Sequence, residues 1–135
     1  MSVEKEIQEL KEKHQALILS HYYEEGSIQD IADAVGDSLF LAQQGEKSKH
    51  PVILLAGVVF MAESVKILSP EKTVLVPDLE AGCSLVNYSP FDQYLKWRLE
   101  NPDAILVSYV NCSALVKSIS DVICTSTNAA QIIKA

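Results

Sequence analysis

Short, continuously apolar segments alternate with segments of helical periodicity along this chain of 135 residues. Residues 51–57 carry no polar side chain, which is typical of a strand covered on both faces of a parallel sheet. Residues 14–20 and 72–76 also predict short strands. Residues 59–68 have helical periodicity and separate the strand at 51–57 from the strand at 72–76. Because parallel neighbours need crossover connections, the sequence predicts an α/β fold of three-layer α/β/α domains with parallel sheets, repeated along the chain.

The second half of the sequence starts the same layout again. We predict a first α/β domain over residues 1–82 and a second, incomplete α/β domain over residues 83–135. In the first half, a capping-box pattern at Ser27 predicts a helix that runs to about Val35. In the second half, residues 90–100 predict an amphipathic helix whose inward side chains include Leu99.

Composition and charge limit the classes of partner. The formal net charge is -7, and residues 47–50 form the one basic cluster, so we expect no nucleic-acid partner. The longest apolar run has about half of the ~20 residues that span a bilayer, and the first residues lack a signal-peptide pattern. We therefore expect a cytoplasmic protein with no membrane partner. Three cysteines, an odd number, argue against a disulfide framework.

Polar side chains follow several of the predicted strands and precede predicted helices. In an open α/β sheet the carboxyl ends of the strands line the ligand crevice, and helix N-termini favour phosphate or carboxylate groups. The spacing therefore predicts a small anionic ligand. The polar segments are His21-Tyr22-Tyr23, Asp37-Ser38, Gly82-Cys83-Ser84, Tyr109-Val110-Asn111 and Thr125-Ser126-Thr127-Asn128. The alternative is that Ser38, Ser84, Ser113 and Asn128 act only as helix caps.

Cys83 is the cysteine with the strongest functional context, because Gly82 and Ser84 flank it where an apolar segment gives way to a predicted helix. A thiolate there could act as a nucleophile, with His21 as its base, or as a metal ligand. A buried thiol that fills a gap in the core is the alternative. Cys112 and Cys124 are expected in the core. One cysteine alone cannot hold an iron–sulfur cluster, so the residues leave these alternatives open.

An ordered set of motifs resembles the quinolinate synthase family, and it covers nearly the whole chain. The motifs are His21-Tyr22-Tyr23, Gly36-Asp37-Ser38-Leu39, Phe60-Met61-Ala62-Glu63-Ser64, residues 77–85 around Cys83, Tyr109-Val110-Asn111 followed by Lys117, and residues 124–129. Each motif is modest, but together and in this order they are specific.

The resemblance implies an enzyme of NAD biosynthesis that condenses iminoaspartate with dihydroxyacetone phosphate to quinolinate, releasing phosphate and water. It implies three similar α/β domains that hold a [4Fe-4S] cluster through one cysteine each, with the fourth iron open to substrate as a Lewis acid. By position, Cys83 resembles the first of these three ligands. The resemblance also implies a functional link to an enzyme that oxidises aspartate.

The resemblance further implies roles for individual side chains. Residues that match substrate-binding positions are His21, Ser38, Tyr109, Val110, Asn111 and Ser126. Residues that match a role in proton transfer are Tyr23 and Tyr109, and His21 is a further candidate acid or base because it lies beside Tyr23 in the predicted crevice. Both substrates are anions, which agrees with the crevice predicted from the residues.

The chain departs from the family in its length. Three domains require about twice as many residues, so we expect this chain to be the first domain and most of a second, with two cluster cysteines beyond Ala135. Exposed apolar surface and an open sheet edge would then favour self-association. The alternative function is a non-catalytic α/β module that binds a small anion or phosphate without iron.

Overall fold

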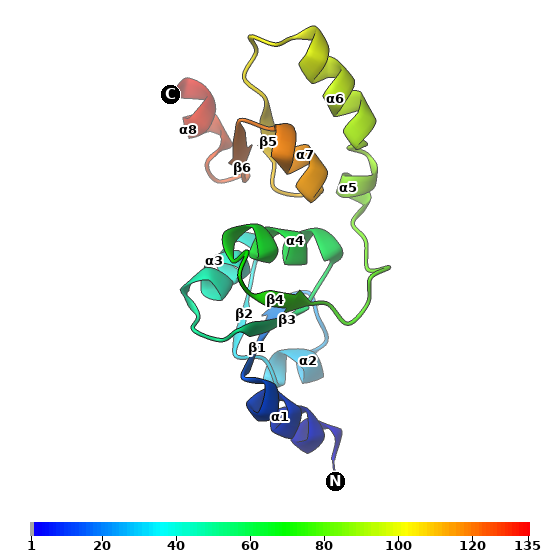
Figure 1. Ribbon diagram of the computed structural model, residues 1–135, viewed down its shortest axis with the longest axis vertical. Coiled ribbons are helices and arrows are strands. Elements are labelled where there is room, and N and C mark those ends of the chain that lie inside the picture. The colour runs from blue at the N-terminus through cyan, green and yellow to red at the C-terminus, as the bar shows by residue number, and fades with distance from the viewer. Residues whose placement is uncertain (1) are drawn as a thin grey trace. The chain divides into compact units, whose positions relative to one another are not determined.

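The computed structural model describes residues 2–135 and confirms the predicted α/β class (Figure 1). The chain forms two compact units, one extending to Ala81 and the other covering Gly82–Ala135. The elements are α1 (Val3–His14), β1 (Ala16–His21), α2 (Gly26–Asp30), β2 (Ala34–Gly36), α3 (Ser38–Lys47), β3 (Val52–Ala56), α4 (Val59–Leu68), β4 (Thr73–Leu75), α5 (Ser84–Asn87), α6 (Phe91–Glu100), β5 (Val107–Tyr109), α7 (Ala114–Ile119), β6 (Val122–Cys124) and α8 (Ala129–Lys134). None of the helices within residues 2–135 combines the length and apolar composition needed to cross a bilayer.

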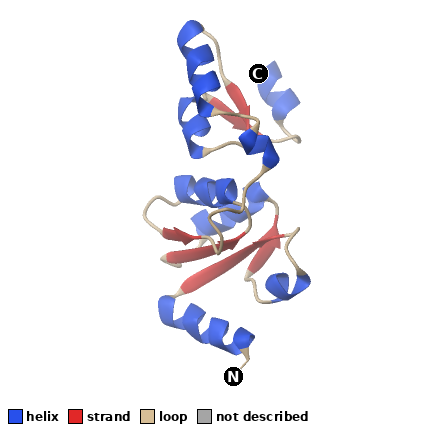
Figure 2. Ribbon diagram, turned by 90° about the vertical axis from the view of Figure 1, so that its right-hand side faces the viewer, coloured by secondary structure: helices blue, strands red, loops and turns tan. Residues whose placement is uncertain are grey.

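The first unit is a parallel sheet of four strands in the order β2-β1-β3-β4, with helices on both faces (Figure 2). Helices α3 and α4 pack on one face, where Leu19, Ile53 and Leu55 are fully buried together with Leu41 and Val65. Helices α1 and α2 lie on the other side of the sheet. This arrangement places the carboxyl ends of the strands along one edge, because all four strands run in the same direction.

The predicted helix from Ser27 to Val35 is wrong beyond its first turns. Helix α2 ends at Asp30, and residues 34–36 instead form β2, which pairs in parallel with β1. The reason is a pair of hydrogen bonds between Asp33 and Ile18: the Asp33 carboxylate accepts the Ile18 N–H at 2.8 Å, and the Ile18 carbonyl accepts the Asp33 N–H at 2.8 Å. These bonds turn the chain out of the helix and align it with the strand.

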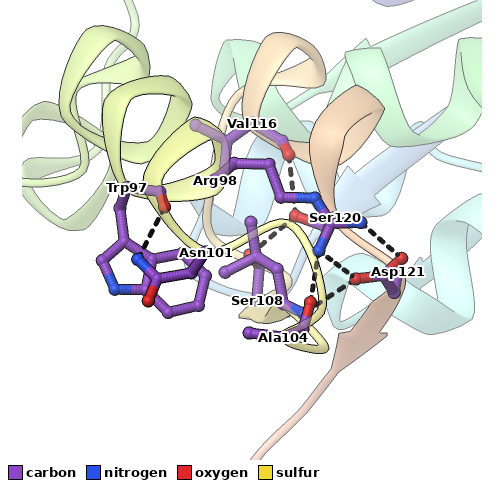
Figure 3. A network of polar contacts seen from close by, with 9 residues as sticks. Trp97, Arg98, Asn101, Ala104, Ser108, Val116, Ser120 and Asp121 are labelled. Carbon is purple, nitrogen blue, oxygen red and sulfur yellow. Dashed lines mark hydrogen bonds and ion pairs between the residues drawn. The ribbon is translucent and has the colours of Figure 1, made fainter.

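The second unit contains the parallel pair β5 and β6, with α6 tied to it by an arginine (Figure 3). The Arg98 guanidinium donates to the Ala104 carbonyl and to the Asp121 carboxylate, which also accepts the Leu106 N–H at 2.8 Å. The Leu106 N–H and then Arg98 lower the pKa of Asp121 from its ordinary value. The prediction that Leu99 points inward is wrong, because 73% of its surface is exposed.

The two units share one local design. The bonds between Asp33 and Ile18 recur as bonds between Asp121 and Leu106. A basic side chain also contacts each carboxylate, from α1 before β1 in the first unit and from α6 before β5 in the second. The strand registers also recur at one constant offset along the chain. Leu19–Ala34, Ser20–Val35 and His21–Gly36 in the first unit correspond to Val107–Val122, Ser108–Ile123 and Tyr109–Cys124 in the second. The segment β1-α2-β2 of the first unit therefore recurs as β5-α7-β6 in the second.

We expect Gly45→Ala to lower the free energy of unfolding. A methyl group at position 45 would lie 2.9 Å from Val65 Cγ1 and 3.1 Å from Ile53 Cδ1, both in the core of the first unit. Overpacking of this kind costs about 1–3 kcal/mol, which outweighs the gain in helix propensity of about 1 kcal/mol. The expected net loss is therefore about 1 kcal/mol, measured by urea unfolding.

Gly26→Ala is the matched control, because no atom outside its chain neighbours and its own helix backbone lies within 4 Å of the methyl group that it would add. Gly26→Ala should leave the urea midpoint unchanged or raise it slightly. Equal midpoints for the two variants would show that α3 is not packed against the sheet as closely as described.

Candidate functional site

His21 is the last residue of β1, and it is buried at the carboxyl edge of the first sheet. Its Nδ1 accepts the Tyr23 backbone N–H at 3.3 Å, which assigns the proton of the neutral ring to Nε2. Burial lowers the pKa of His21, against the opposing effect of the Glu24 and Asp37 carboxylates.

Two tyrosine rings surround the His21 imidazole. Tyr22 stacks on it with ring centroids 4.5 Å apart, and Tyr23 meets it edge-on at 4.8 Å. Tyr23 is the more exposed of the two tyrosines, with 81% of its surface accessible against 48% for Tyr22. The structure therefore brings together His21 and Tyr23, two of the residues predicted to act in proton transfer.

Ser38 lies on the same edge of the sheet as His21. His21 pairs with Gly36 of β2, and Ser38 follows two residues later as the first residue of α3. The helix cap is Asp37, whose carboxylate accepts the Phe40 N–H at 2.8 Å. Since Asp37 satisfies the cap, the structure does not require Ser38 for that purpose.

Cys83 lies at the N-cap position of α5, half-buried, with its sulfur 3.8 Å from the Asn111 side-chain nitrogen. The expectation that a strand ends directly in the segment 82–84 is wrong, because β4 ends at Leu75 and an irregular segment leads to Cys83. The sulfur nevertheless lies in a polar environment, since the Asn111 amide donates toward it. This contact brings together two predicted site residues from distant parts of the second unit.

Tyr109 and Val110 continue from β5 toward Asn111. Tyr109 is the last residue of β5 and is 44% exposed. The Val110 side chain is buried, its N–H donates to the Cys124 carbonyl at 2.8 Å, and its carbonyl accepts bonds from two nitrogens. Val110 thus connects the strand to the segment that presents Asn111.

Ser126 is exposed in the loop that follows β6. Asn128 closes this loop, because its side-chain oxygen accepts the Thr125 N–H at 2.7 Å. Asn128 also occupies the N-cap position of α8, which agrees with its predicted place at a helix start. Ser126 itself is two residues beyond the last residue of β6, as Ser38 is two residues beyond β2.

The offset that relates the two units also relates their predicted site residues. By this offset His21 corresponds to Tyr109, and each is the last residue of its strand. Ser38 corresponds to Ser126, and each lies two residues beyond the end of the neighbouring strand. Each unit therefore presents one ring and one hydroxyl at the same two positions of its sheet. Ser20 and Ser108, one residue before the rings, are buried in both units.

The three cysteines differ in what they expose. Cys112 and Cys124 are buried, with 3% and 7% of their surfaces accessible, as predicted for core positions, whereas Cys83 is half-buried. Within residues 2–135, no cluster of three or more His, Cys, Asp or Glu side chains is arranged to hold a metal ion. Cys83 is therefore the most accessible of the three cysteines.

Two residues next to the site had no predicted role. Gln29 and Lys117 donate hydrogen bonds to backbone carbonyls in the segments that follow β1 and β5. Sequence patterns do not show such bonds, because the acceptors are backbone atoms. Comparison of the two halves of the chain at their common offset would have placed both residues at equivalent positions.

Comparison with known proteins finds one family. The family described as Quinolinate synthetase A protein matches residues 5–135. The quinolinate synthase of Chloroherpeton thalassium is 52% identical over 129 residues, covering 96% of this chain and 40% of the relative. Those of Trichodesmium erythraeum and Nostoc punctiforme are 53% and 54% identical over 128 residues, covering 95% of this chain and 40% of each relative. The chain thus spans about 40% of the length of these curated relatives.

We expect His21 to titrate below its ordinary pKa of 6.5, because burial of the ring disfavours the imidazolium. As the pH falls below 6.5, the unfolded chain binds the proton first, so the first unit should lose stability between pH 6.5 and the lower pKa of the folded state. The measurement is an NMR titration of the His21 ring, with urea midpoints at each pH.

Glu24→Gln is the control for this titration. The Glu24 carboxylate raises the pKa of His21, so its removal should lower that pKa further. A His21 pKa at or above 6.5 would contradict the described burial.

Proposed function

The chain belongs to the quinolinate synthase family, as its motifs predicted, and we propose that it supplies part of the site where iminoaspartate and dihydroxyacetone phosphate condense to quinolinate. The observation that supports this proposal is the repeated strand-end arrangement: His21 with Ser38, and Tyr109 with Ser126. An N–H or O–H donor and a hydroxyl at two strand ends suit substrates that carry carboxylate and phosphate groups. An enzyme that oxidises aspartate would supply the iminoaspartate.

His21 would bind and orient an anionic substrate. Its Nδ1 is bonded to the Tyr23 N–H, so Nε2–H is the atom that donates to a carboxylate or phosphate oxygen. Because burial keeps the imidazole neutral near pH 7, His21 acts as a hydrogen-bond donor without a fixed charge. The hydroxyls of Ser38 and Ser126 would complete the contacts to the same groups.

The tyrosine hydroxyls would move protons. Tyr109 and Tyr23 are both partly exposed, and each lies at or just beyond the carboxyl end of the strand that precedes it. Condensation to an aromatic ring requires proton transfer to and from carbon and oxygen, and a tyrosine Oη can serve as acid or base in such steps. Tyr23 lies edge-on to the His21 ring, which is close enough for the two residues to act on one substrate.

Enzymes of this family generally depend on an iron–sulfur cluster, and Cys83 is the residue that would hold it here. Among the cysteines of residues 2–135, Cys83 alone is half-exposed, and the Asn111 amide lies beside its sulfur, as is common for cluster thiolates. When bound, a cluster with one open iron would supply Lewis-acid chemistry. The other cysteine ligands would come from outside the residues described.

A chimera tests the proposed function. This chain replaces the matching 40% of the Chloroherpeton thalassium quinolinate synthase, and the product is reconstituted anaerobically with iron and sulfide. We expect quinolinate from iminoaspartate and dihydroxyacetone phosphate. Cys83→Ala should lose the bound iron and at least about 100-fold of the activity, since even outer-shell changes cost about 10–100-fold.

Cys112→Ala in the same chimera is the matched control, and it should keep its iron because Cys112 is buried. Iron retained by Cys83→Ala would overturn the assignment of the ligand. A chimera that binds phosphate but no iron, and forms no quinolinate, would instead favour the non-catalytic anion-binding module.

A further inference from the structure

We propose that Gln29 and Lys117 are equivalent positioning residues, which fix Tyr23 and Asn111 by bridging the backbone carbonyls on either side of each. The inference rests on the proposed function, because that function gives Tyr23 and Asn111 their roles. Neither Gln29 nor Lys117 would touch the substrate.

In the second unit, Lys117 reaches back from α7 to the segment after β5. Its ammonium donates to the Val110 carbonyl at 3.0 Å and to the Cys112 carbonyl at 2.5 Å. These carbonyls belong to the residues immediately before and after Asn111. The Cys112 N–H also donates to the Val110 carbonyl at 2.9 Å, which closes a tight turn with Asn111 at its centre.

In the first unit, Gln29 makes the corresponding bonds from α2. Its side-chain amide donates to the Tyr22 carbonyl at 3.2 Å and to the Glu24 carbonyl at 2.7 Å. These carbonyls flank Tyr23. The Tyr23 N–H between them donates to Nδ1 of His21, so the bridge also supports the contact that sets the His21 tautomer.

The two bridges occupy the same place in the repeated fold. The constant offset that relates β1 with β5 also relates α2 with α7, and by this offset Gln29 corresponds to Lys117. An amide and an ammonium are chemically different, yet each donates to the carbonyls on both sides of a predicted site residue. The shared feature is a donor that spans two carbonyls, which indicates a positioning role independent of the charge.

The bridge acts on the direction of the central side chain. The Val110 carbonyl lies in a peptide plane that meets the Cα of Asn111, and the Cys112 carbonyl lies one plane further along. Because Lys117 holds both carbonyls and the Cys112 N–H closes the turn between them, the backbone at Asn111 has little freedom to rotate, which limits the direction of its Cβ. The observed result is an Asn111 amide nitrogen 3.8 Å from the Cys83 sulfur. Misplacement of a site group by 1 Å can cost about 100-fold in rate, so such a bridge has a functional consequence.

The first experiment measures alkylation of each cysteine of this chain by iodoacetamide, resolved by mass spectrometry, without iron or substrate. Asn111→Ala should raise the rate at Cys83 several-fold, because the Asn111 amide lies beside that sulfur. Lys117→Met should raise the rate by a similar factor, and the double variant should add nothing, since the two residues act in series. Lys117→Arg should restore the original rate.

Two controls separate positioning from a loss of structure. Cys124 is buried in β6 and reports unfolding of the second unit, so it should stay protected in every variant. Lys96→Met removes an exposed lysine of α6 and should leave the Cys83 rate unchanged. An unchanged Cys83 rate in Lys117→Met, or equal gains at Cys83 and Cys124, would overturn the proposal.

The second experiment addresses Gln29 through the NMR contact between the His21 and Tyr23 rings, whose centroids are 4.8 Å apart. Gln29→Leu should weaken this contact, whereas Gln29→Lys should keep it, as Lys117 does the same work in the second unit. Gln8→Leu, on the exposed side of α1, is the control. A contact that survives Gln29→Leu would overturn the role of Gln29.

The chimera links the bridge to function. Lys117→Met should lower kcat/KM by about 10-fold or more while leaving the iron content unchanged. A change in Cys83 alkylation with no change in kcat/KM would overturn the functional role of the bridge. A chimera that binds no iron at all would overturn the proposed function, and the alkylation and NMR results would still stand or fall by themselves.

Discussion

In each unit, one carboxylate fixes how two parallel strands pair, β1 with β2 and β5 with β6. Asp33 accepts the backbone N–H of Ile18 inside β1, and Asp121 accepts that of Leu106 just before β5. A basic side chain pairs with each carboxylate, Lys11 of α1 with Asp33 and Arg98 of α6 with Asp121. Because register decides which residue ends each strand, these bonds determine which side chains reach the ligand edge.

The predicted site residues follow from that register. With His21 opposite Gly36, and Tyr109 opposite Cys124, the hydroxyl-bearing loops begin at equivalent points. A slip of one residue would move the His21 ring to the other face of the sheet. The polar strand ends therefore depend on a carboxylate at the opposite end of the same strands, and the site is only as well defined as the register.

The sequence predicted the buried strands and the ends that carry chemistry, because apolar runs and the polar residues after them are local signals. It missed β2, since Ala34–Gly36 is three residues long, only partly buried, and aligned with β1 by bonds of Asp33 that leave no local pattern. It also missed the roles of Gln29 and Lys117. Their acceptors are backbone carbonyls, and no local pattern of side chains records a contact of that kind.

The difference between Gln29 and Lys117 agrees with what each unit contains. An ammonium at position 29 would add positive charge near His21. Because burial of the ring already disfavours the imidazolium, this charge would make protonation of His21 still less favourable. In the second unit the ammonium holds the segment whose side-chain amide nitrogen lies 3.8 Å from the Cys83 sulfur. The repeated backbone geometry thus accepts two donors of different charge, and in the first unit the neutral donor adds no charge beside the His21 ring.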